Sequence, residues 1–150
     1  MKRGETLMTK RIGILTCSNC TQELNCASAV CLGDMRKKKG FFERYQNQEI
    51  NLIGITSCAS CPTLAAPEKI LRRVKALADF RIDALHLSYC MTALCPFINK
   101  YIEVIKKEYP EIEIVEGTHK PLDKNVFRNE VKDLICLRKK DMNDYILGKI

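Results

Sequence analysis

The sequence predicts a three-layer α/β fold in which helices cover both faces of a four-stranded, mostly parallel sheet. Short apolar runs that are typical of buried strands alternate along the chain with segments whose apolar residues recur at helical spacing. Strands that alternate with helices favour right-handed crossovers and parallel neighbours within one sheet. No internal repeat, low-complexity tract or linker interrupts this alternation.

Four strands and four helices make up the predicted order. The strands are predicted at residues 12–15, 49–55, 82–87 and 112–115. Gly40 and Pro110 are natural helix stops, whereas Pro67 and Pro96 suit the first turn of a helix. The helices are therefore predicted at residues 28–39, from Pro67, from Pro96 to Pro110, and at 125–137. We expect the strand order 2-1-3-4 of a flavodoxin/Rossmann-like sheet.

The chain of 150 residues is long enough for one domain with its own core. Residues 1–10 are polar and basic and include a second methionine, so we expect a flexible N-terminal extension before a single domain over residues 11–150. No apolar run approaches the roughly 18–20 residues of a membrane span, and the first residues lack the apolar segment of a signal peptide. We therefore expect no membrane partner.

The net charge is +7, but the basic residues are scattered apart from short runs at residues 36–39 and 138–140. A nucleic-acid surface typically concentrates basic residues on one face, with interleaved aromatic residues or a known motif. Neither feature is visible, so the sequence argues against a nucleic-acid partner. It leaves protein partners open.

Nine cysteines are the unusual feature of the composition. A secreted disulfide scaffold fits poorly, because the chain is not small, shows no export signal and has an odd number of cysteines. In a cytosolic protein such a set is typical of metal binding or of thiol catalysis. We therefore expect a cytoplasmic protein in a reducing environment.

Most of the cysteines directly follow the predicted strands. Because the carboxyl ends of parallel strands share one edge of a sheet, where ligands bind, we expect these side chains to converge on one site. The cysteines follow the first three strands and a histidine follows the fourth. The candidate metal ligands are Cys17, Cys20, Cys26, Cys58, Cys61, Cys90, Cys95 and His119.

The spacing of these cysteines agrees with metal binding. Cys17 and Cys20 form one C-x-x-C motif and Cys58 and Cys61 another, a spacing that lets both sulfurs bind one ion at about 2.3 Å. Soft thiolates select zinc, copper(I) or iron–sulfur clusters. Cys61 and Cys95 each precede a proline, which would place the thiol near a helix N-terminus and stabilise the thiolate.

Three further residues have less certain roles in the sequence. Cys31 fits either a ligand or a small core residue, since cysteine is often buried. Cys136 is predicted to lie in the core, on the apolar side of the last helix together with Ile135. His86 lies inside the third strand, where a histidine is either a structural residue or a ligand.

The pattern resembles the CGGC-domain family over roughly residues 10 to 120. Cys58-Ala59-Ser60-Cys61-Pro62 stands where the family carries its C-G-G-C motif. The resemblance implies metal binding, often of zinc, within a prokaryotic family. Other similar segments are Gly13-Ile14 before Cys17, the Cys26 and Cys31 segment with Phe41-Phe42 and Tyr45 after it, His86 to Cys90 followed by Cys95-Pro96, and Gly117-Thr118-His119.

Two departures from the family are informative. Ala59 and Ser60 replace the two glycines of the motif, which weakens the expectation of a positive φ there. Thr16 stands in place of the arginine that usually precedes the first cysteine, so a contact of that arginine with an anionic ligand would be absent.

Three functions fit these observations. The first is a metal-binding protein with a zinc or iron–sulfur site at the carboxyl edge of the sheet. The second is a thiol–disulfide oxidoreductase that uses the Cys58–Cys61 pair. The third is a module for a nucleotide, a flavin or a partner, although no G-x-G-x-x-G or P-loop motif supports it. The sequence leaves open whether the protein is an enzyme.

Overall fold

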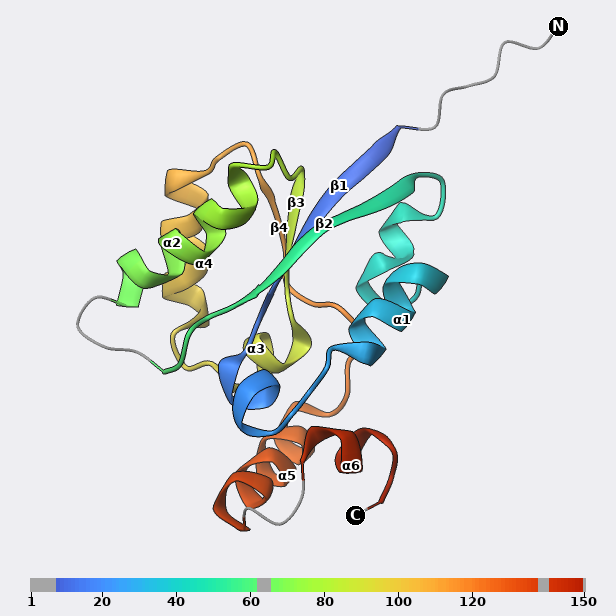
Figure 1. Ribbon diagram of the computed structural model, residues 1–150, viewed down its shortest axis with the longest axis vertical. Helices are drawn as coiled ribbons and strands as arrows, with labels where there is room; N and C mark the ends of the chain where they lie inside the picture. Colours follow the sequence, from blue (N-terminus) through green and yellow to red (C-terminus); the bar gives the residue numbers. More distant parts are fainter. Residues whose placement is uncertain (1–7, 62–65, 138–140, 150) are drawn as a thin grey trace, which may run out of the picture.

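The computed structural model describes residues 8–61, 66–137 and 141–149, and a four-stranded sheet forms its centre (Figure 1). All strand pairs are parallel and follow the order β2-β1-β3-β4. The predicted fold class, strand order and number of strands are thus confirmed. The strands are β1 (Thr9–Thr16), β2 (Glu49–Ser57), β3 (Ala84–Leu87) and β4 (Glu113–Val115).

Helices cover both faces of the sheet (Figure 1). One face carries α1 (Ala29–Lys37) and the 3₁₀ helix η2 (Gly40–Tyr45), and the other carries α2 (Ala66–Ala78) and α4 (Ile98–Glu108). The alternation of side chains along β1 explains both layers. Ile12 and Ile14 join the core cluster under α1 and η2, whereas Leu15 joins the larger cluster under α2 and α4.

Residues 9 and 10 belong to β1, although they fall within the expected N-terminal extension. Residues 1–7 lie outside the described part of the chain. Pro62, which was expected to place Cys61 near a helix N-terminus, lies outside it as well. The basic run at residues 138–140 is also outside it.

Two short helical turns directly follow strands and were not predicted. The π-helical turn η1 (Asn19–Glu23) follows β1, and α3 (Tyr89–Leu94) follows β3. A turn at Pro96 and Phe97 follows α3, so α4 begins at Ile98 rather than at Pro96. Helices of five or six residues span fewer than two turns, too few to produce a readable apolar period.

The last two helices lie at the carboxyl ends of the strands rather than on a face of the sheet, at the bottom of Figure 1. They are α5 (Lys124–Leu137), which was predicted, and the five-residue α6 (Met142–Ile146), which was not. This placement puts them next to the edge at which the cysteines were expected to gather.

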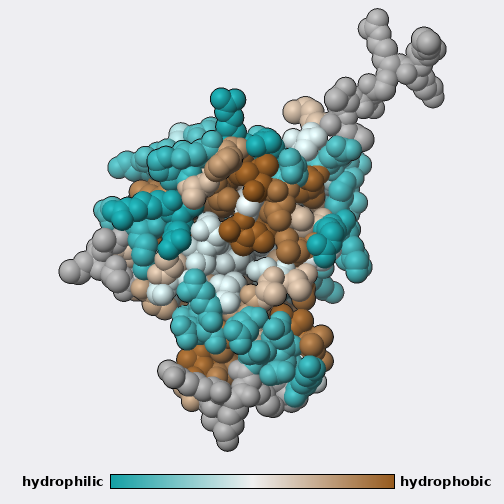
Figure 2. Space-filling model, viewed as in Figure 1, coloured by the Kyte–Doolittle hydropathy of each residue, from teal (hydrophilic) through white to brown (hydrophobic). Residues whose placement is uncertain are grey.

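On the face shown in Figure 2, the surface over the helices is mostly hydrophilic. Figure 2 shows hydrophobic residues gathered near the middle of one face, where Figure 1 draws the edge strand β2. Ile55 of this strand is 40% exposed. Within the described ranges, no helix is both long enough and apolar enough to span a bilayer.

Candidate metal centre

The ends of β1, β2 and β3 bring three cysteine segments to one edge of the sheet. Backbone hydrogen bonds continue just past the strands: the N–H of Cys58 donates to the carbonyl of Thr16 at 2.9 Å, and that of Ser88 donates to Leu15 at 2.9 Å. Cys17, Cys58 and Cys90 therefore follow the ends of three strands that are neighbours in the sheet. Their convergence follows from the parallel order.

The thiol of Cys17 lies at the centre of a cluster that also contains Cys20, Cys58 and Cys90. Interactions with the thiols of Cys20 and Cys58 lower the pKa of Cys17. Interactions with Cys17 and Cys20 lower the pKa of Cys90 well below its usual value. The same contacts raise the pKa of Cys20 and Cys58, with burial adding to the effect. Interactions among the four thiols thus lower the pKa of two of them and raise the pKa of the other two. We call these four residues the thiol cluster.

Ser18 connects the two C-x-x-C segments. Its backbone N–H donates to the sulfur of Cys58 at 3.4 Å, and its hydroxyl oxygen accepts from the backbone N–H of Ser60 at 2.9 Å. The side chain of Ser18 is buried. A buried serine therefore fixes the second cysteine loop against the first.

Ala59 and Ser60 adopt left-handed backbone conformations, with φ of 60° and 80°. Because neither residue is glycine, the sequence argued against a positive φ at these two positions. This expectation is wrong. A non-glycine residue in this region costs about 1–2 kcal/mol. The loop keeps the shape that glycine would favour, at a cost in conformational energy.

The ammonium of Lys69 stabilises this loop from the side of α2. It donates to the backbone carbonyls of Ala59, Ser60 and Cys61 at 3.2, 3.1 and 3.4 Å. Hydrogen bonds from a charged donor are stronger than those between neutral groups. Lys69 was missed by the sequence reasoning, because its distance of eight residues from Cys61 follows no known motif.

Four of the predicted ligands line a cavity of about 230 Å³ beside the thiol cluster. Its walls include the apolar residues Met91, Leu94 and Tyr101. The four predicted ligands in its wall are Cys17, Cys58, Cys61 and Cys95.

Cys95 does not lie at a helix N-terminus, where the sequence placed it. It caps the C-terminus of α3, with its N–H donating to the carbonyl of Met91 at 3.0 Å. Burial raises the pKa of its thiol. The expected stabilisation of a thiolate at Cys95 is therefore wrong. For Cys61 the same expectation is not tested, because residues 62–65 lie outside the described chain.

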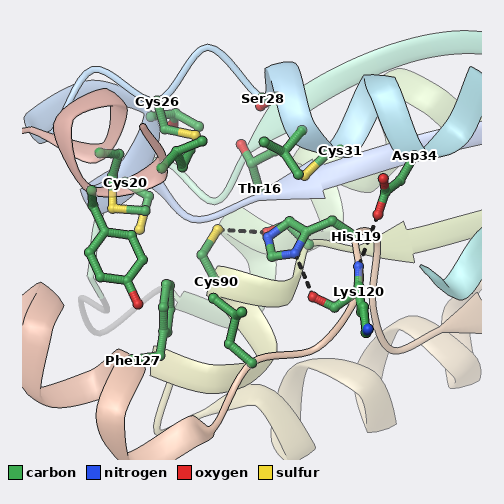
Figure 3. Close-up of a pocket in the computed structure, with 17 residues that line it drawn as sticks. Thr16, Cys20, Cys26, Ser28, Cys31, Asp34, Cys90, His119, Lys120 and Phe127 are labelled. Atoms are coloured by element: carbon green, nitrogen blue, oxygen red, sulfur yellow. Dashed lines mark hydrogen bonds between the residues drawn. The ribbon is translucent and has the colours of Figure 1, made fainter. Parts of the chain in front are cut away.

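A second cavity, of about 480 Å³, lies on the other side of the thiol cluster and is shown in Figure 3. We call it the large cavity. Cys20, Cys26 and Cys90 line one part of it, together with His119 (Figure 3). The hydroxyl of Ser88 lies 3.0 Å from the sulfur of Cys90. The eight predicted ligands thus divide between two adjoining cavities.

The loop after β4 holds His119 at the wall of the large cavity. The N–H of Phe41 in η2 donates to Thr118 at 3.0 Å, and the N–H of Lys120 donates to the Asp34 carboxylate at 3.0 Å. Gly40 has φ of 57°, and a Cβ there would lie 2.7 Å from the nitrogen of Lys120. This close approach requires glycine at position 40.

His119 has the hydrogen-bonding pattern of a ligating histidine. Its Nδ1 lies 2.9 Å from the carbonyl oxygen of Lys120, which can only accept, so Nδ1 carries the proton. In the neutral ring this leaves the lone pair on Nε2. Metal-binding histidines commonly donate their second N–H to a carbonyl in this way.

His86 lies outside the site. Its Nδ1 donates to the carbonyl of Gly117 at 2.7 Å, and its Nε2 accepts from the Tyr45 hydroxyl at 2.9 Å. The ring is fully buried and stacks on Phe42 with centroids 4.4 Å apart. Both nitrogens are used, so His86 is a structural residue.

The two remaining cysteines differ from each other. Cys31 is buried at the wall of the large cavity, 3.1 Å from the hydroxyl of Thr118, and burial raises its pKa to about 11. Cys136 is exposed, as is Ile135, so the prediction that both lie in the core is wrong. The buried stripe of α5 runs through Phe127, Val131 and Leu134, and Cys136 lies about 200° around the helix from Leu134.

The thiols are neighbours without forming a closed coordination shell. Across residues 8–61, 66–137 and 141–149, no group of three or more histidine, cysteine, aspartate or glutamate side chains is arranged to hold a metal ion. All nine cysteines are free thiols.

The fold and the site together define a cysteine-rich, parallel α/β protein whose thiols gather at the carboxyl edge of the sheet. The family model of the CGGC domain matches residues 11–119, and the chain belongs to this family, whose cysteine content points to metal binding. Searches among curated proteins and among solved structures gave no match.

Proposed function

We propose that this protein binds a thiophilic metal, either zinc or an iron–sulfur cluster, at the carboxyl edge of its sheet. The observation that carries the proposal is the thiol cluster, in which residues from three strand ends surround Cys17. Cys17, Cys20, Cys58 and Cys90 are the central ligands. Cys26, Cys61, Cys95 and His119 line the two adjoining cavities and complete the candidate set.

The donor set fits such a metal. Four cysteines are the number that a structural zinc ion or a [4Fe–4S] cluster takes, and thiolates favour these over magnesium or calcium. A bound cation also supplies the charge that lets neighbouring thiols ionise together. Rotation about a single side-chain torsion moves each sulfur relative to its neighbours.

The adjoining cavities bear on the role of the metal. A structural zinc site is closed by protein ligands, whereas a site used for chemistry keeps one position open. When bound, zinc would supply a Lewis acid, and an iron–sulfur cluster would supply a one-electron carrier.

Anaerobic purification followed by elemental analysis and an absorption spectrum tests the proposal. About one metal site per chain is expected, and a broad band at roughly 400 nm would identify iron–sulfur chemistry. Cys17→Ser and Cys58→Ser should lower the metal content strongly. Cys136→Ser is the matched control and should retain it, because Cys136 is exposed on α5. A protein without metal, or an equal loss in all three variants, would contradict the proposal.

A thiol–disulfide oxidoreductase that uses Cys58 and Cys61 is the second candidate. Exposure of Cys61 favours it, as does the Asn19 side chain, which donates to the Cys61 sulfur at 3.4 Å. The raised pKa of Cys58 opposes it, because the thiolate is the attacking species. A Cys58→Ser variant that keeps full metal content but loses disulfide reductase activity would establish this second function instead.

A further inference from the structure

The large cavity lies between the thiol cluster and the two C-terminal helices. Cys20, Cys26 and Cys90 line one side of it, and α5 and α6 supply an apolar side (Figure 3). The residues that these two helices contribute are Phe127, Met142, Tyr145 and Ile146. The volume of about 480 Å³ falls within the usual range for small-molecule pockets.

Specific contacts hold α6 against the loop that carries the cysteines. The N–H of Met142 donates to the carbonyl of Leu24 at 2.7 Å, and the Asn143 side chain donates to the carbonyl of Asn25 at 3.0 Å. Asp141 caps the helix by accepting from the N–H groups of Asn143 and Asp144. The outer wall of the large cavity is therefore built onto the segment between Cys20 and Cys26.

Aromatic packing holds α5 in the same way. The ring of Phe127 meets Tyr89 of α3 edge-on at 5.2 Å and Tyr145 of α6 at 6.0 Å. The guanidinium of Arg128 donates to the carbonyl of Ala93, which closes the contact between α5 and α3. The large cavity is thus a defined space between packed elements.

The chemistry of the walls indicates the class of ligand. Phe127, Met142 and Ile146 make the side formed by α5 and α6 apolar, whereas polar residues such as Ser28, Asp34 and Lys120 stand elsewhere in the wall. An apolar body therefore suits the side formed by α5 and α6. At the other side lie the thiols. A metal that bound only three of them would keep one position open towards the cavity, and it would prefer a soft donor atom there.

We propose that the large cavity binds a small, largely apolar molecule that carries one thiol group, with its sulfur facing the thiol cluster. The preference for sulfur rests on the proposed metal site, whereas the apolar fit does not. Phe127, Met142, Tyr145 and Ile146 all lie beyond residue 119, where the match to the family model ends. The part of this chain outside the family match therefore selects the ligand.

Methyl NMR of protein labelled at its methionine methyl groups tests the proposal, with benzyl mercaptan as the probe and benzyl alcohol as its hard-donor counterpart. Met142 lines the cavity, whereas Met8 is exposed and Met35, a residue of α1, packs against the core cluster under that helix. Benzyl mercaptan should shift the Met142 methyl signal and leave those of Met8 and Met35 in place. In the metal-loaded protein it should bind at least tenfold more tightly than benzyl alcohol.

A pair of variants on α6 serves as the structural control. Ile146→Trp should fill the cavity and weaken binding at least tenfold, with the metal content unchanged. Leu147→Trp should bind like the wild type, because Leu147 is 64% exposed and is not part of the wall. Equal binding to Ile146→Trp and the wild type would overturn the proposal. The wild-type titration decides even where a variant does not fold.

The outcomes separate this proposal from the metal site. If Met142 does not respond to either probe, the proposal is overturned, whatever the metal content. If the metal-loaded protein binds both probes equally, the sulfur preference is overturned. If elemental analysis finds no metal, the proposed function fails, and a Met142 shift with either probe still supports the apolar fit.

Discussion

The hydroxyl oxygen of Ser18 accepts a hydrogen bond from the backbone N–H of Ser60 at 2.9 Å, and this contact ties the two C-x-x-C segments together. The N–H of Ser18 donates in addition to the sulfur of Cys58 at 3.4 Å. One buried serine therefore sets the relative position of two cysteine segments that are about 40 residues apart in the chain. This role makes it a sensitive test of the site.

Replacing Ser18 by alanine should lower both stability and metal affinity. The N–H of Ser60 loses its partner, which costs about 1–2 kcal/mol in the free energy of unfolding. Loss of such supporting contacts typically lowers metal affinity about 10–100-fold. Urea unfolding and chelator competition measure the two effects. Ser57→Ala, at the end of β2, is the control and should change metal affinity less than threefold. Equal affinities for Ser18→Ala and Ser57→Ala would refute the role of Ser18.

Restoring glycine in the second motif should stabilise the protein. Ala59 and Ser60 have φ of 60° and 80°, so Ala59→Gly and Ser60→Gly each remove backbone strain. The expected net gain is about 0.5–1 kcal/mol per site, because the added freedom of glycine in the unfolded chain offsets part of the relief. Denaturant unfolding checks this. Ala78→Gly in α2 should instead destabilise the protein by about 1 kcal/mol. Destabilisation by both loop variants would argue against the left-handed loop.

Removing the ammonium of Lys69 should loosen the same loop. Its hydrogen bonds to three consecutive carbonyls are charge-assisted, so Lys69→Met should lower the free energy of unfolding by about 1.5–3 kcal/mol. Lys75→Met on the same helix removes only an exposed ion pair with Asp79 and should leave the free energy of unfolding nearly unchanged. Indistinguishable unfolding curves for the two variants would contradict the role of Lys69.

Stability should fall between roughly pH 6.5 and pH 4 because of His86. Burial lowers the pKa of His86 to about 4, below its ordinary value of 6.5. In this pH range the unfolded chain takes up a proton that the folded protein does not, so the stabilisation is complete above the unfolded pKa. It is lost as the pH falls towards the folded pKa, by about 3 kcal/mol in total.

Urea unfolding at several pH values measures this effect. His86→Gln should flatten the profile in that range. A profile that is equally steep in the wild type and in His86→Gln would show that another group is responsible.

The sequence predicted the sheet edge well because parallel topology alone places strand ends together. The cysteines after β1, β2 and β3 needed only the strand positions and the order 2-1-3-4, both of which the structure confirms. The division into two cavities was not predictable, since it depends on the short α3 and on how α5 and α6 pack. The helices α3 and α6 are too short to show a readable apolar period, and the period of α5 does not tell where that helix packs.

The individual errors have similar physical causes. Cys136 looked like a core residue because its helix is amphipathic, but a shift of two positions from Leu134 moves it to the exposed side. The left-handed loop was hidden because Ala59 and Ser60 adopt a conformation that their residue types disfavour. Ser18 and Lys69 act through contacts with residues distant in the chain, which no local pattern reveals.

X-ray absorption at the edge of the bound metal tests the central claim most directly, because it reports which atoms surround the ion. If the thiol cluster is the site, the spectrum should show mainly sulfur neighbours at about 2.3 Å. Cys58→Ser should reduce the sulfur contribution or abolish binding, and Cys136→Ser should reproduce the wild-type spectrum. A first shell of oxygen and nitrogen atoms, or one unaffected by Cys58→Ser, would contradict the account.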